Sequence, residues 1–372
     1  MKFYTNFFMR GNYVTVRGYN NGKRFTDRIP YNPTLYVPAR NKSDWNAIDG
    51  SPLESIEMGS IRDARDFAKK YVEVENFKIY GSTLYDYVYL NENYTQDYDT
   101  DYIRVLNIDI EVGSEEGFPD PQLANQPVTA ITVSLDGAYY TFGCQDYTVK
   151  SDKVTYLQCT DERELLLNFL KHWRMWDADI ITGWNVLGFD VPYLYNRMTK
   201  LLGETTAKKL SPVGMIQERE YERYNQKKID IEFVGMKVID YLDLYRKFTY
   251  SQQESYRLDH IAHVELGEKK LDYSEVETLH QLYKLDYEKF IDYNIKDVEL
   301  IDKIEDKMKL MHMILAIAYD AKVNYSDVFT QVRMWDVLIH NWLADRKIAI
   351  PPKERKDKSS QFAGGYVKDP DV

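Results

Sequence analysis

The stretch that decides the fold is RVLNIDIEV at residues 104–112, in which apolar and polar side chains alternate. Alternation with a period of two is typical of a β-strand that is buried on one face. The apolar face of this predicted strand comprises Leu106, Ile108, Ile110 and Val112. Asn107, Asp109 and Glu111 lie on the other face, so the strand presents two neighbouring carboxylates on the same side.

The residues after this strand continue an alternation of strands and helices. AITVSL at 130–135 and AYYTF at 138–142 flank Asp136-Gly137, a strong signal for an antiparallel hairpin. DERELLLNFLKHWRMW at 161–176 has helical spacing, with Asp161 and Glu164 placed as a capping box. ADIITGWN at 178–185 predicts a buried strand, and GFDVPYLYNRM at 188–198 begins another helix. The predicted fold class is therefore α/β, a mixed sheet flanked by helices.

The flanking regions predict two further parts of the chain. Residues 1–103 read as an α+β domain, with an Asn21-Gly22 hairpin turn and a helix from Ser60 to about residue 71. The polar run NENYTQDYDTDY at 91–102 is interpreted as a linker. Residues 285–320 have the pattern of two helices. We expect domains at 1–103 and 104–309, followed by a segment, 310–372, that returns to the first domain.

Composition narrows the function classes. The 372 residues include 59 acidic and 48 basic side chains, a net charge of −11, which argues against a protein that coats duplex DNA. An acidic pocket for divalent cations remains compatible with this charge. Only two cysteines occur and no apolar run could span a membrane, so we expect a cytoplasmic protein without a disulfide framework. Walker-type and GxGxxG loops are absent, which removes the usual support for nucleotide-cofactor binding.

Two acidic positions elsewhere in the chain could join the first pair. Asp190 follows a buried strand, and Asp297 follows Tyr293 by one helical turn. Each of these acidic features also has an ordinary structural explanation. An acid pair such as Asp109 and Glu111 can occur by chance, Asp190 could cap a helix, and Asp297 could lie on a solvated face. Together, however, the four carboxylates could hold two cations for hydrolysis of a phosphodiester.

The motifs DIEV at 109–112, NVLGFD at 185–190 and YNIKD at 293–297 resemble the three exonuclease motifs of family B DNA polymerases. In that family they belong to the tyrosine variant of the DEDD nucleases, which have a ribonuclease-H-like fold. FPDP at 118–121, ITGWN at 181–185 and IDYLDLYRKF at 239–248 are similar to polymerases of T-even-like bacteriophages.

The resemblance implies a site with two Mg²⁺ ions, for which Mn²⁺ is a substitute. Asp109, Glu111 and Asp297 would hold one ion, and Asp109 would bridge to a second ion near Asp190. Tyr293 would orient the attacking water. These five residues are the expected catalytic set.

The resemblance also implies contacts with the DNA strand. Phe118 would press on the 3′-terminal base, and Asn185 and Phe189 would help to hold the frayed strand, although loop and core roles for the last two remain open. Lys270 would lie near the phosphate, but Asp272 stands where the family has proline. Residues 217–234 resemble the long hairpin that helps to move a primer end.

The implied function is proofreading 3′→5′ exonuclease action on single-stranded DNA 3′ ends or a frayed primer-template. The family's polymerase motif does not occur, and the chain stops before the polymerase palm, so the polymerase half of the enzyme is an expected partner. A sliding clamp would act only through that missing part, and no membrane partner is expected. The alternative is a non-catalytic module that binds nucleic acid or assembles a split polymerase.

Overall fold

The computed structural model describes residues 1–71, 74, 77–115, 117, 119–223, 226–272, 274–276 and 278–352, with the backbone alone for 220–223 and 226–228. The chain forms two compact units. The first comprises residues 1–31 and 86–339, and the second comprises residues 32–85 with the segment from residue 340 onward. Among the described helices, none combines the length and the apolar character that crossing a bilayer requires.

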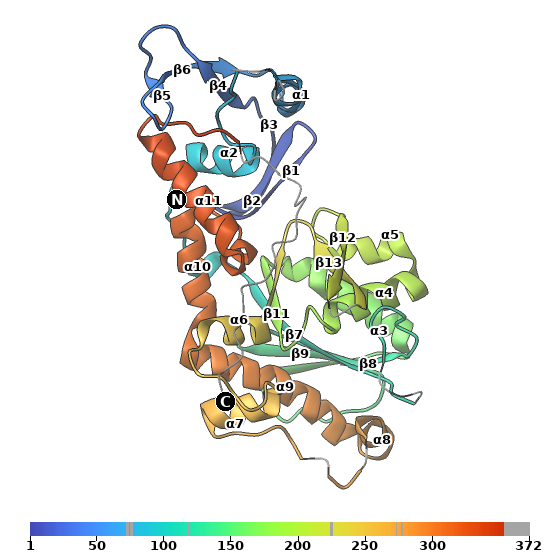
Figure 1. Ribbon diagram of the computed structural model, residues 1–372. Coiled ribbons are helices and arrows are strands. Elements are labelled where there is room, and N and C mark those ends of the chain that lie inside the picture. The colour runs from blue at the N-terminus through green and yellow to red at the C-terminus, as the bar shows by residue number, and fades with distance from the viewer. Residues whose placement is uncertain are drawn as a thin grey trace, which may run out of the picture. The chain divides into compact units, whose positions relative to one another are not determined.

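A mixed six-stranded sheet lies at the centre of the first unit (Figure 1). Its strands are β7 (Val105–Val112), β8 (Val128–Leu135), β9 (Ala138–Gly143), β10 (Val154–Gln158), β11 (Ile180–Gly183) and β14 (Lys237–Asp240). They are ordered β10-β9-β8-β7-β11-β14. β7 pairs antiparallel with β8 and parallel with β11. The predicted α/β fold class, with helices on a mixed sheet, is confirmed and is consistent with the ribonuclease-H-like type.

Strand β7 has the two faces that its alternation predicts. Leu106, Ile108 and Ile110 are buried in the main hydrophobic cluster of the unit. The β8–β9 hairpin turns at Asp136 and Gly137, whose φ angles are 51° and 78°. Positive φ at both central residues is the geometry that Asp-Gly favours in a two-residue turn, which confirms this prediction.

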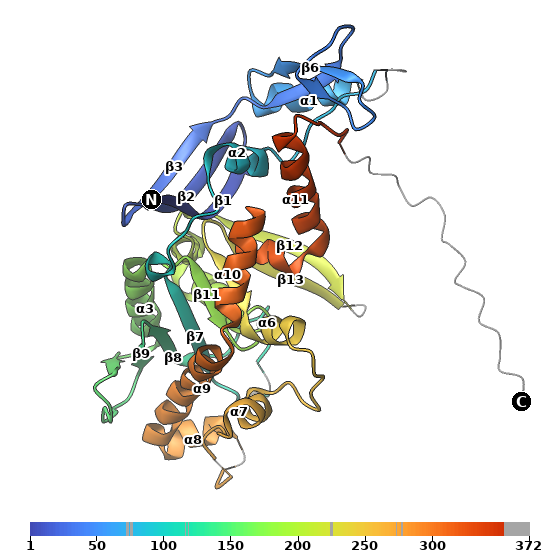
Figure 2. The same ribbon diagram turned by 90° about the vertical axis from the view of Figure 1, so that its left-hand side faces the viewer.

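Helices cover both faces of the sheet. On the apolar face lie α3 (Glu162–Trp176) and α4 (Asp190–Leu202), whose buried side chains join the same cluster as β7. On the acidic face lies α9 (Tyr287–Met308), which contacts β7 and β8. Figure 2 shows α7 (Leu258–Leu266) and α8 (Leu279–Leu285) beside α9. The acidic side chains of β7 therefore face one long helix.

The cap of α3 differs in one respect from its prediction. Asp161 is the N-cap and accepts a hydrogen bond of 2.8 Å from the Glu164 amide, as expected. The Glu164 carboxylate, however, accepts from the amide and hydroxyl of Thr160 and not from the Asp161 amide. Only half of the predicted capping box forms, because the Thr160 hydroxyl offers Glu164 a second donor one residue earlier.

The remaining elements complete the course of the chain. The helices are α2 (Tyr85–Asn93), α5 (Glu204–Ala207), α6 (Tyr241–Phe248), α10 (Leu310–Ala321) and α11 (Gln331–Asp345), with 3-10 turns at Thr100–Tyr102, Lys208–Leu210 and Tyr325–Phe329. The further strands are β1 (Lys2–Arg10), β2 (Tyr13–Asn20), β3 (Lys23–Pro30), β12 (Ile216–Arg223) and β13 (Gln226–Phe233).

Two predictions for these elements have clear outcomes. The two helices predicted over 285–320 are confirmed as α9 and α10, which separate at Lys309 with φ of 55°. The linker predicted at 91–102 is wrong at both ends, since residues 91–93 continue α2 and residues 100–102 form a 3-10 turn. Tyrosine-rich polar sequence is compatible with short helices once their aromatic rings pack against neighbouring elements.

Buried ion pairs join β2 and β3 to the end of α3. Arg17, whose side chain is 2% exposed, pairs with Asp177 at 2.7 Å. Arg24 pairs with the fully buried Asp179 at 2.6 Å. Because an unpaired buried charge is costly, these pairs fix residues 1–31 to the sheet that carries the acidic strand.

The second unit has a small sheet of its own. Its strands, in the order β4-β6-β5, are β4 (Thr34–Pro38), β5 (Trp45–Asn46) and β6 (Pro52–Glu57), and its helix is α1 (Ile61–Tyr71). The Asp63 amide donates a hydrogen bond of 3.1 Å to the Ser60 hydroxyl, which confirms the predicted helix and its cap. The domain boundaries at residues 103 and 309 stay a prediction.

Candidate active site

Three carboxylates from distant parts of the chain converge in front of β7. Asp109 and Glu111 project from the strand, and Asp297 projects from α9. One oxygen of each lies within 4.8 Å of the others. Asp297 is 3% exposed and its Oδ1 atom has no hydrogen-bond partner, so the solvated-face alternative for this residue is excluded.

Asn294 on α9 fixes the position of Asp109. Its Nδ2 atom donates a hydrogen bond of 2.6 Å to Asp109 Oδ2. Its Oδ1 atom accepts one of 2.5 Å from the hydroxyl of Thr132, which lies opposite Asp109 on β8. Asn294 is fully buried. A continuous chain of hydrogen bonds therefore orients the carboxylate, as partners of metal ligands commonly do.

Asp190 lies beside the three carboxylates without belonging to their group. It is the first residue of α4, and Phe189 is the N-cap, so Asp190 does not cap this helix. Its Oδ1 atom accepts a hydrogen bond of 3.0 Å from the Ile110 amide of β7. Asp190 is buried and raises the pKa of Asp109, which means that the two carboxylates act on each other.

The loop before α4 is held by Asp240 at the end of β14. The Asp240 carboxylate accepts hydrogen bonds of 3.0 Å from the amides of Asn185 and Leu187. Asn185 has φ of 63°, a left-handed conformation that asparagine tolerates better than most residues. Its side chain is exposed, whereas Phe189 is half-buried and its ring lies 5.4 Å from that of Tyr193. Asn185 is therefore the more accessible of the two predicted strand contacts.

Lys270 brings the one cation that touches the described carboxylates of this site. Its ammonium group donates to Asp297 Oδ2 and, at 3.1 Å, to the Tyr293 hydroxyl. Burial lowers the pKa of Lys270, but Asp297 and Tyr293 raise it, and the net direction is upward. Burial and the charge of Asp297 also raise the pKa of Tyr293, which stays a neutral phenol. The phenol therefore keeps its O–H close to the acids.

The chemistry of this donor set fits a hard divalent cation. Burial, followed by the charge of Asp297, raises the pKa of Glu111 to about 8, and burial raises the pKa of Asp190 to about 7. Such shifts mean that the negative charge of these acids lacks compensation, so that both keep their protons more readily when no cation is bound. Carboxylate oxygens at this density are the ligands that Mg²⁺ and Mn²⁺ accept, and the unpartnered oxygen of Asp297 is free to bind.

Two predicted elements of the DNA contact have different outcomes. Phe118 lies outside the described residues. The predicted hairpin at 217–234 is formed by β12 and β13, whose register runs from Ile216 opposite Phe233 to Arg223 opposite Gln226. A role in moving a primer end stays a prediction.

Sequence analysis did not find two residues that organise the site. Asn294 stands within the YNIKD motif and Asp240 within IDYLDLYRKF, so both lie in stretches that already carried the resemblance. The hydrogen-bond partners of these side chains cannot be predicted from the sequence. Asp109, for example, is 185 residues away from Asn294. Only the packing of β7 and β14 against their neighbours reveals the two contacts.

Comparison with known proteins agrees with this geometry. Residues 64–261 match the family described as DNA polymerase family B, exonuclease domain. The chain belongs to this family. Membership in family B explains why the DIEV and NVLGFD motifs converge at one end of the sheet. The chain carries the exonuclease domain of a DNA polymerase.

The individual relatives include phage and eukaryotic polymerases. The DNA-directed DNA polymerases of Escherichia phage RB69 and Enterobacteria phage T4 are 32% and 30% identical to this family B chain over 94% and 99% of its length. The DNA polymerase delta catalytic subunit of Glycine max is 28% identical over 71% of the chain. The chain spans 42% and 44% of the two phage proteins, which is less than half of either.

Proposed function

We propose that this chain is the proofreading 3′→5′ exonuclease part of a family B DNA polymerase, and that it hydrolyses the 3′-terminal phosphodiester of single-stranded or frayed DNA. The observation that carries the proposal is the convergence of Asp109, Glu111 and Asp297 within 4.8 Å, beside Asp190 and Tyr293. A purely non-catalytic module would have no reason to keep a buried cluster of acids that raise one another's pKa values.

The metal-binding roles divide between two groups of acids. Asp109, Glu111 and Asp297 would hold one Mg²⁺ ion, and Asp190 with Asp109 would hold the second. The chemistry that such a pair of bound ions supplies is activation of a water and stabilisation of the leaving 3′ oxygen. Asn294 keeps Asp109 in place for both roles through its hydrogen bond of 2.6 Å.

Tyr293 and Lys270 act on the substrate side of the acids. The Tyr293 hydroxyl would donate to the attacking water or to the scissile phosphate, because its raised pKa keeps the proton on the phenol. The Lys270 ammonium, which contacts Asp297 and Tyr293 in the absence of metal, would turn to the phosphate once cations bind Asp297. The Asp272 that follows does not remove this contact, since Lys270 is held from the other side by Asp259.

The DNA strand would be held by exposed groups near the site. Asn185 would contact the strand backbone, Phe118 would stack on the terminal base, and the exposed edge of Phe189 would complete the binding surface. Selectivity for mismatches would follow from fraying, because only an unpaired end can reach carboxylates on a buried strand. The polymerase activity would belong to the rest of the enzyme, which acts with this chain in the cytoplasm.

Digestion of a 5′-labelled single-stranded oligonucleotide in Mg²⁺ tests the proposal. The wild-type chain should shorten the oligonucleotide from its 3′ end, and EDTA should stop the reaction. The Asp109→Ala/Glu111→Ala variant should be inactive. Asp44→Ala/Glu54→Ala removes two exposed acids from the second unit as a matched control and should retain full activity.

Two outcomes would contradict the proposal. One is a folded wild-type chain that leaves the oligonucleotide intact in both Mg²⁺ and Mn²⁺, which would favour the non-catalytic module. The other is a ladder that persists in the Asp109→Ala/Glu111→Ala variant, which would place the activity elsewhere or in a contaminant.

A further inference from the structure

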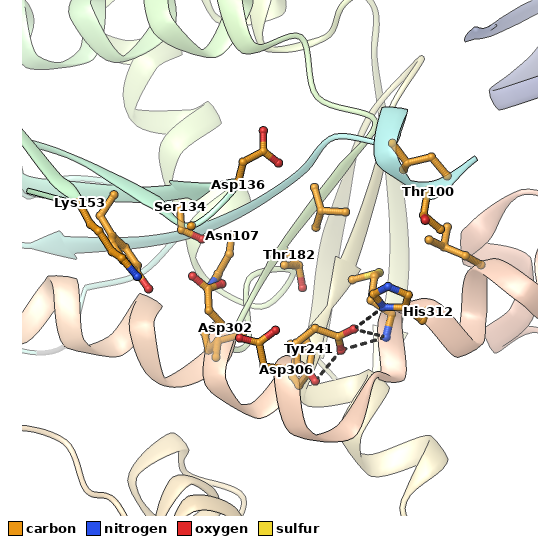
Figure 3. A pocket seen from close by; sticks show the side chains of 18 residues that line it. Thr100, Asn107, Ser134, Asp136, Lys153, Thr182, Tyr241, Asp302, Asp306 and His312 are labelled. Carbon is orange, nitrogen blue, oxygen red and sulfur yellow. Dashed lines mark hydrogen bonds and ion pairs between the residues drawn. The ribbon is translucent and has the colours of Figure 1, made fainter. Parts of the chain in front are cut away.

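The acids of α9 that line a cavity of about 450 Å³ at the start of β7 are already paired within the protein (Figure 3). Asp302 accepts a hydrogen bond of 2.8 Å from Asn107, and Asp306 pairs with Lys309 at 3.2 Å. Glu305 accepts hydrogen bonds from a tyrosine hydroxyl and from a backbone amide. The opposite end of β7, beside the converging carboxylates, has contacts that the proposed hydrolysis does not explain.

The loop after β7 starts next to the candidate metal site. Glu111 belongs to the group of converging carboxylates, and Gly113 follows it by two residues. The Gly113 amide donates a hydrogen bond of 2.8 Å to the Pro127 carbonyl, which fixes the start of the loop. Of the next four residues the structure describes 114, 115 and 117. A DNA strand that reaches Glu111 from this end of the sheet would lie beside these residues.

An acid in this loop contacts α8. The Glu115 carboxylate accepts hydrogen bonds from His280 Nε2 at 2.9 Å and from the Lys284 ammonium. These bonds, that from Lys284 first, hold the pKa of Glu115 below its usual range, so Glu115 is a carboxylate near neutral pH. The His280 side chain is only 14% exposed, and its ring stacks on that of Tyr283 with 6.1 Å between centroids. One partner of Glu115 is therefore held firmly on the helix.

Helix α8 is joined directly to the helix that carries Tyr293 and Asp297. Asp286 is both the C-cap of α8 and the N-cap of α9, and its side chain accepts a hydrogen bond of 3.0 Å from the Lys289 amide. A single capping residue between two helices limits their relative motion. Through Glu115, the loop after the first acidic pair is thus tied to the element that supplies the third carboxylate.

A second contact holds the same loop from the side of α4. Gln126 Nε2 donates a hydrogen bond of 3.2 Å to the Gly117 carbonyl. The Tyr193 hydroxyl of α4 in turn donates one of 2.6 Å to the Gln126 carbonyl. Asp190 is the first residue of the same helix. The described part of the loop is therefore attached to the helices of both other acidic motifs.

We propose that Glu115, His280 and Lys284 form a latch that positions the loop after β7 beside the metal site, and that this latch sets how tightly the 3′ end of a DNA strand is bound. They are positioning residues, because they act on the strand through the loop. The Glu115 and Lys284 side chains are 60% and 56% exposed, so we expect a modest effect on binding, as for other surface ion pairs. The inference rests on the proposed function, since it concerns the strand that the exonuclease degrades.

Binding of a 5′-fluorescent single-stranded oligonucleotide, measured by anisotropy in EDTA, tests the latch without hydrolysis. Glu115→Ala should weaken the affinity about threefold to fivefold, because the loop loses its contact with α8. In Mg²⁺ the same loss should appear in KM and not in kcat, since no proposed metal ligand has changed. Glu275→Ala is the matched control and should bind as the wild type does, because Glu275 pairs with Lys289 outside this loop.

The direction of the change separates the latch from a direct contact with DNA. If Glu115 faced the strand itself, Glu115→Ala would remove repulsion from the phosphates and strengthen binding, which would overturn the proposal. Lys284→Ala should weaken the affinity as Glu115→Ala does, and the double variant should bind no more weakly than Glu115→Ala alone. An additive loss in the double variant would also overturn the proposal, by showing that Lys284 binds a phosphate directly.

Failure of the latch and failure of the nuclease give different results. Unchanged affinity and KM in Glu115→Ala, with folding verified by circular dichroism, would overturn the latch and leave the proposed function intact. A wild-type chain that binds the oligonucleotide in EDTA but leaves it intact in Mg²⁺ and Mn²⁺ would contradict the proposed function, while the affinities of the variants would still test the latch. A wild-type chain without affinity for the oligonucleotide would contradict both.

Discussion

The two ends of the contact between β7 and α9 use the same kinds of residue for different purposes. At one end, Asp109, Glu111 and Asp297 bring oxygens within 4.8 Å of one another. At the other end, Asn107 donates a hydrogen bond of 2.8 Å to Asp302, and Glu305 and Asp306 follow about one turn later on α9. The first arrangement suits a metal ion, whereas the second engages its acid in hydrogen bonds within the protein.

The difference shows that acid content alone does not define a site. Both ends have acids with raised pKa values and an asparagine that contacts a carboxylate. At the end with the converging acids the asparagine is fully paired through Thr132, whereas at the other end Asn107 keeps an unpaired oxygen. The convergence of oxygens and the completeness of hydrogen bonding decide what each end can bind.

The largest effect is expected from Asp297→Asn, which replaces one carboxylate oxygen of the converging group, a proposed metal ligand, by an amide nitrogen. We expect exonuclease activity to fall about 10³-fold, as loss of several kcal/mol of transition-state stabilisation implies. Asp292→Asn is the matched change on α9, where Asp292 pairs with Lys150 and not with the site. Equal losses in the two variants would show that the helix, and not the ligand, had been disturbed.

Asn294→Ala should have the next largest effect. Removal of its amide leaves Asp109 without its orienting donor, and such changes typically cost about 10–100-fold in activity or metal affinity. Steady-state kinetics with varied Mg²⁺ should show an increased metal requirement. Asn196→Ala, which removes a hydrogen bond of 2.8 Å to the Pro121 carbonyl on the opposite face of the sheet, is the control. An unaltered metal dependence in Asn294→Ala would contradict the positioning role.

Tyr293→Phe should lower the rate of hydrolysis about tenfold, since it removes one general hydrogen-bond donor from the site. The loss should appear in kcat with little change in KM, because the ring still fills its place. Tyr147→Phe, between β9 and β10, is the control, because the Tyr147 hydroxyl donates to Asp292 near the start of the same helix at 2.8 Å. A loss confined to KM would instead assign Tyr293 to strand binding.

The smallest effect concerns stability and pH in the absence of metal. The pKa of Glu111 is raised from 4.5 to about 8 by burial and by Asp297, so the folded chain holds this proton where the unfolded chain has released it. The free energy of unfolding of the metal-free chain should therefore fall as the pH rises from about 4.5 to 8. Glu111→Gln should reduce that fall by about 1 kcal/mol after allowance for solvent screening.

Urea unfolding in EDTA at pH 5 and pH 8 measures this difference. Glu54→Gln, which changes an exposed residue of the second unit, should leave the pH dependence unaltered. Added Mg²⁺ should stabilise the wild type at pH 8 more than it stabilises Glu111→Gln, because the ion binds only the folded state. If the free energy of unfolding had the same pH dependence in the wild type and in Glu111→Gln, the charge of the Glu111 carboxylate would be compensated without metal.

The sequence by itself determined the local structure around the site. Alternation placed Asp109 and Glu111 on the face of β7 opposite its buried residues, and Asp-Gly specified the β8–β9 turn. Helical spacing placed Tyr293 and Asp297 on one face of α9. These predictions succeeded because backbone periodicity and turn preference depend only on neighbouring residues.

Only the tertiary structure decided which of these faces meet. The bond between Asn294 and Asp109 joins residues 185 apart, and the bond between Asn107 and Asp302 joins residues 195 apart. The sequence placed Asn107 on the acidic face of β7 but did not show that its oxygen stays unpaired. Packing of a helix on a sheet fixes these partners, because hydrogen bonds over such separations depend on the distance between elements and not on the spacing within one.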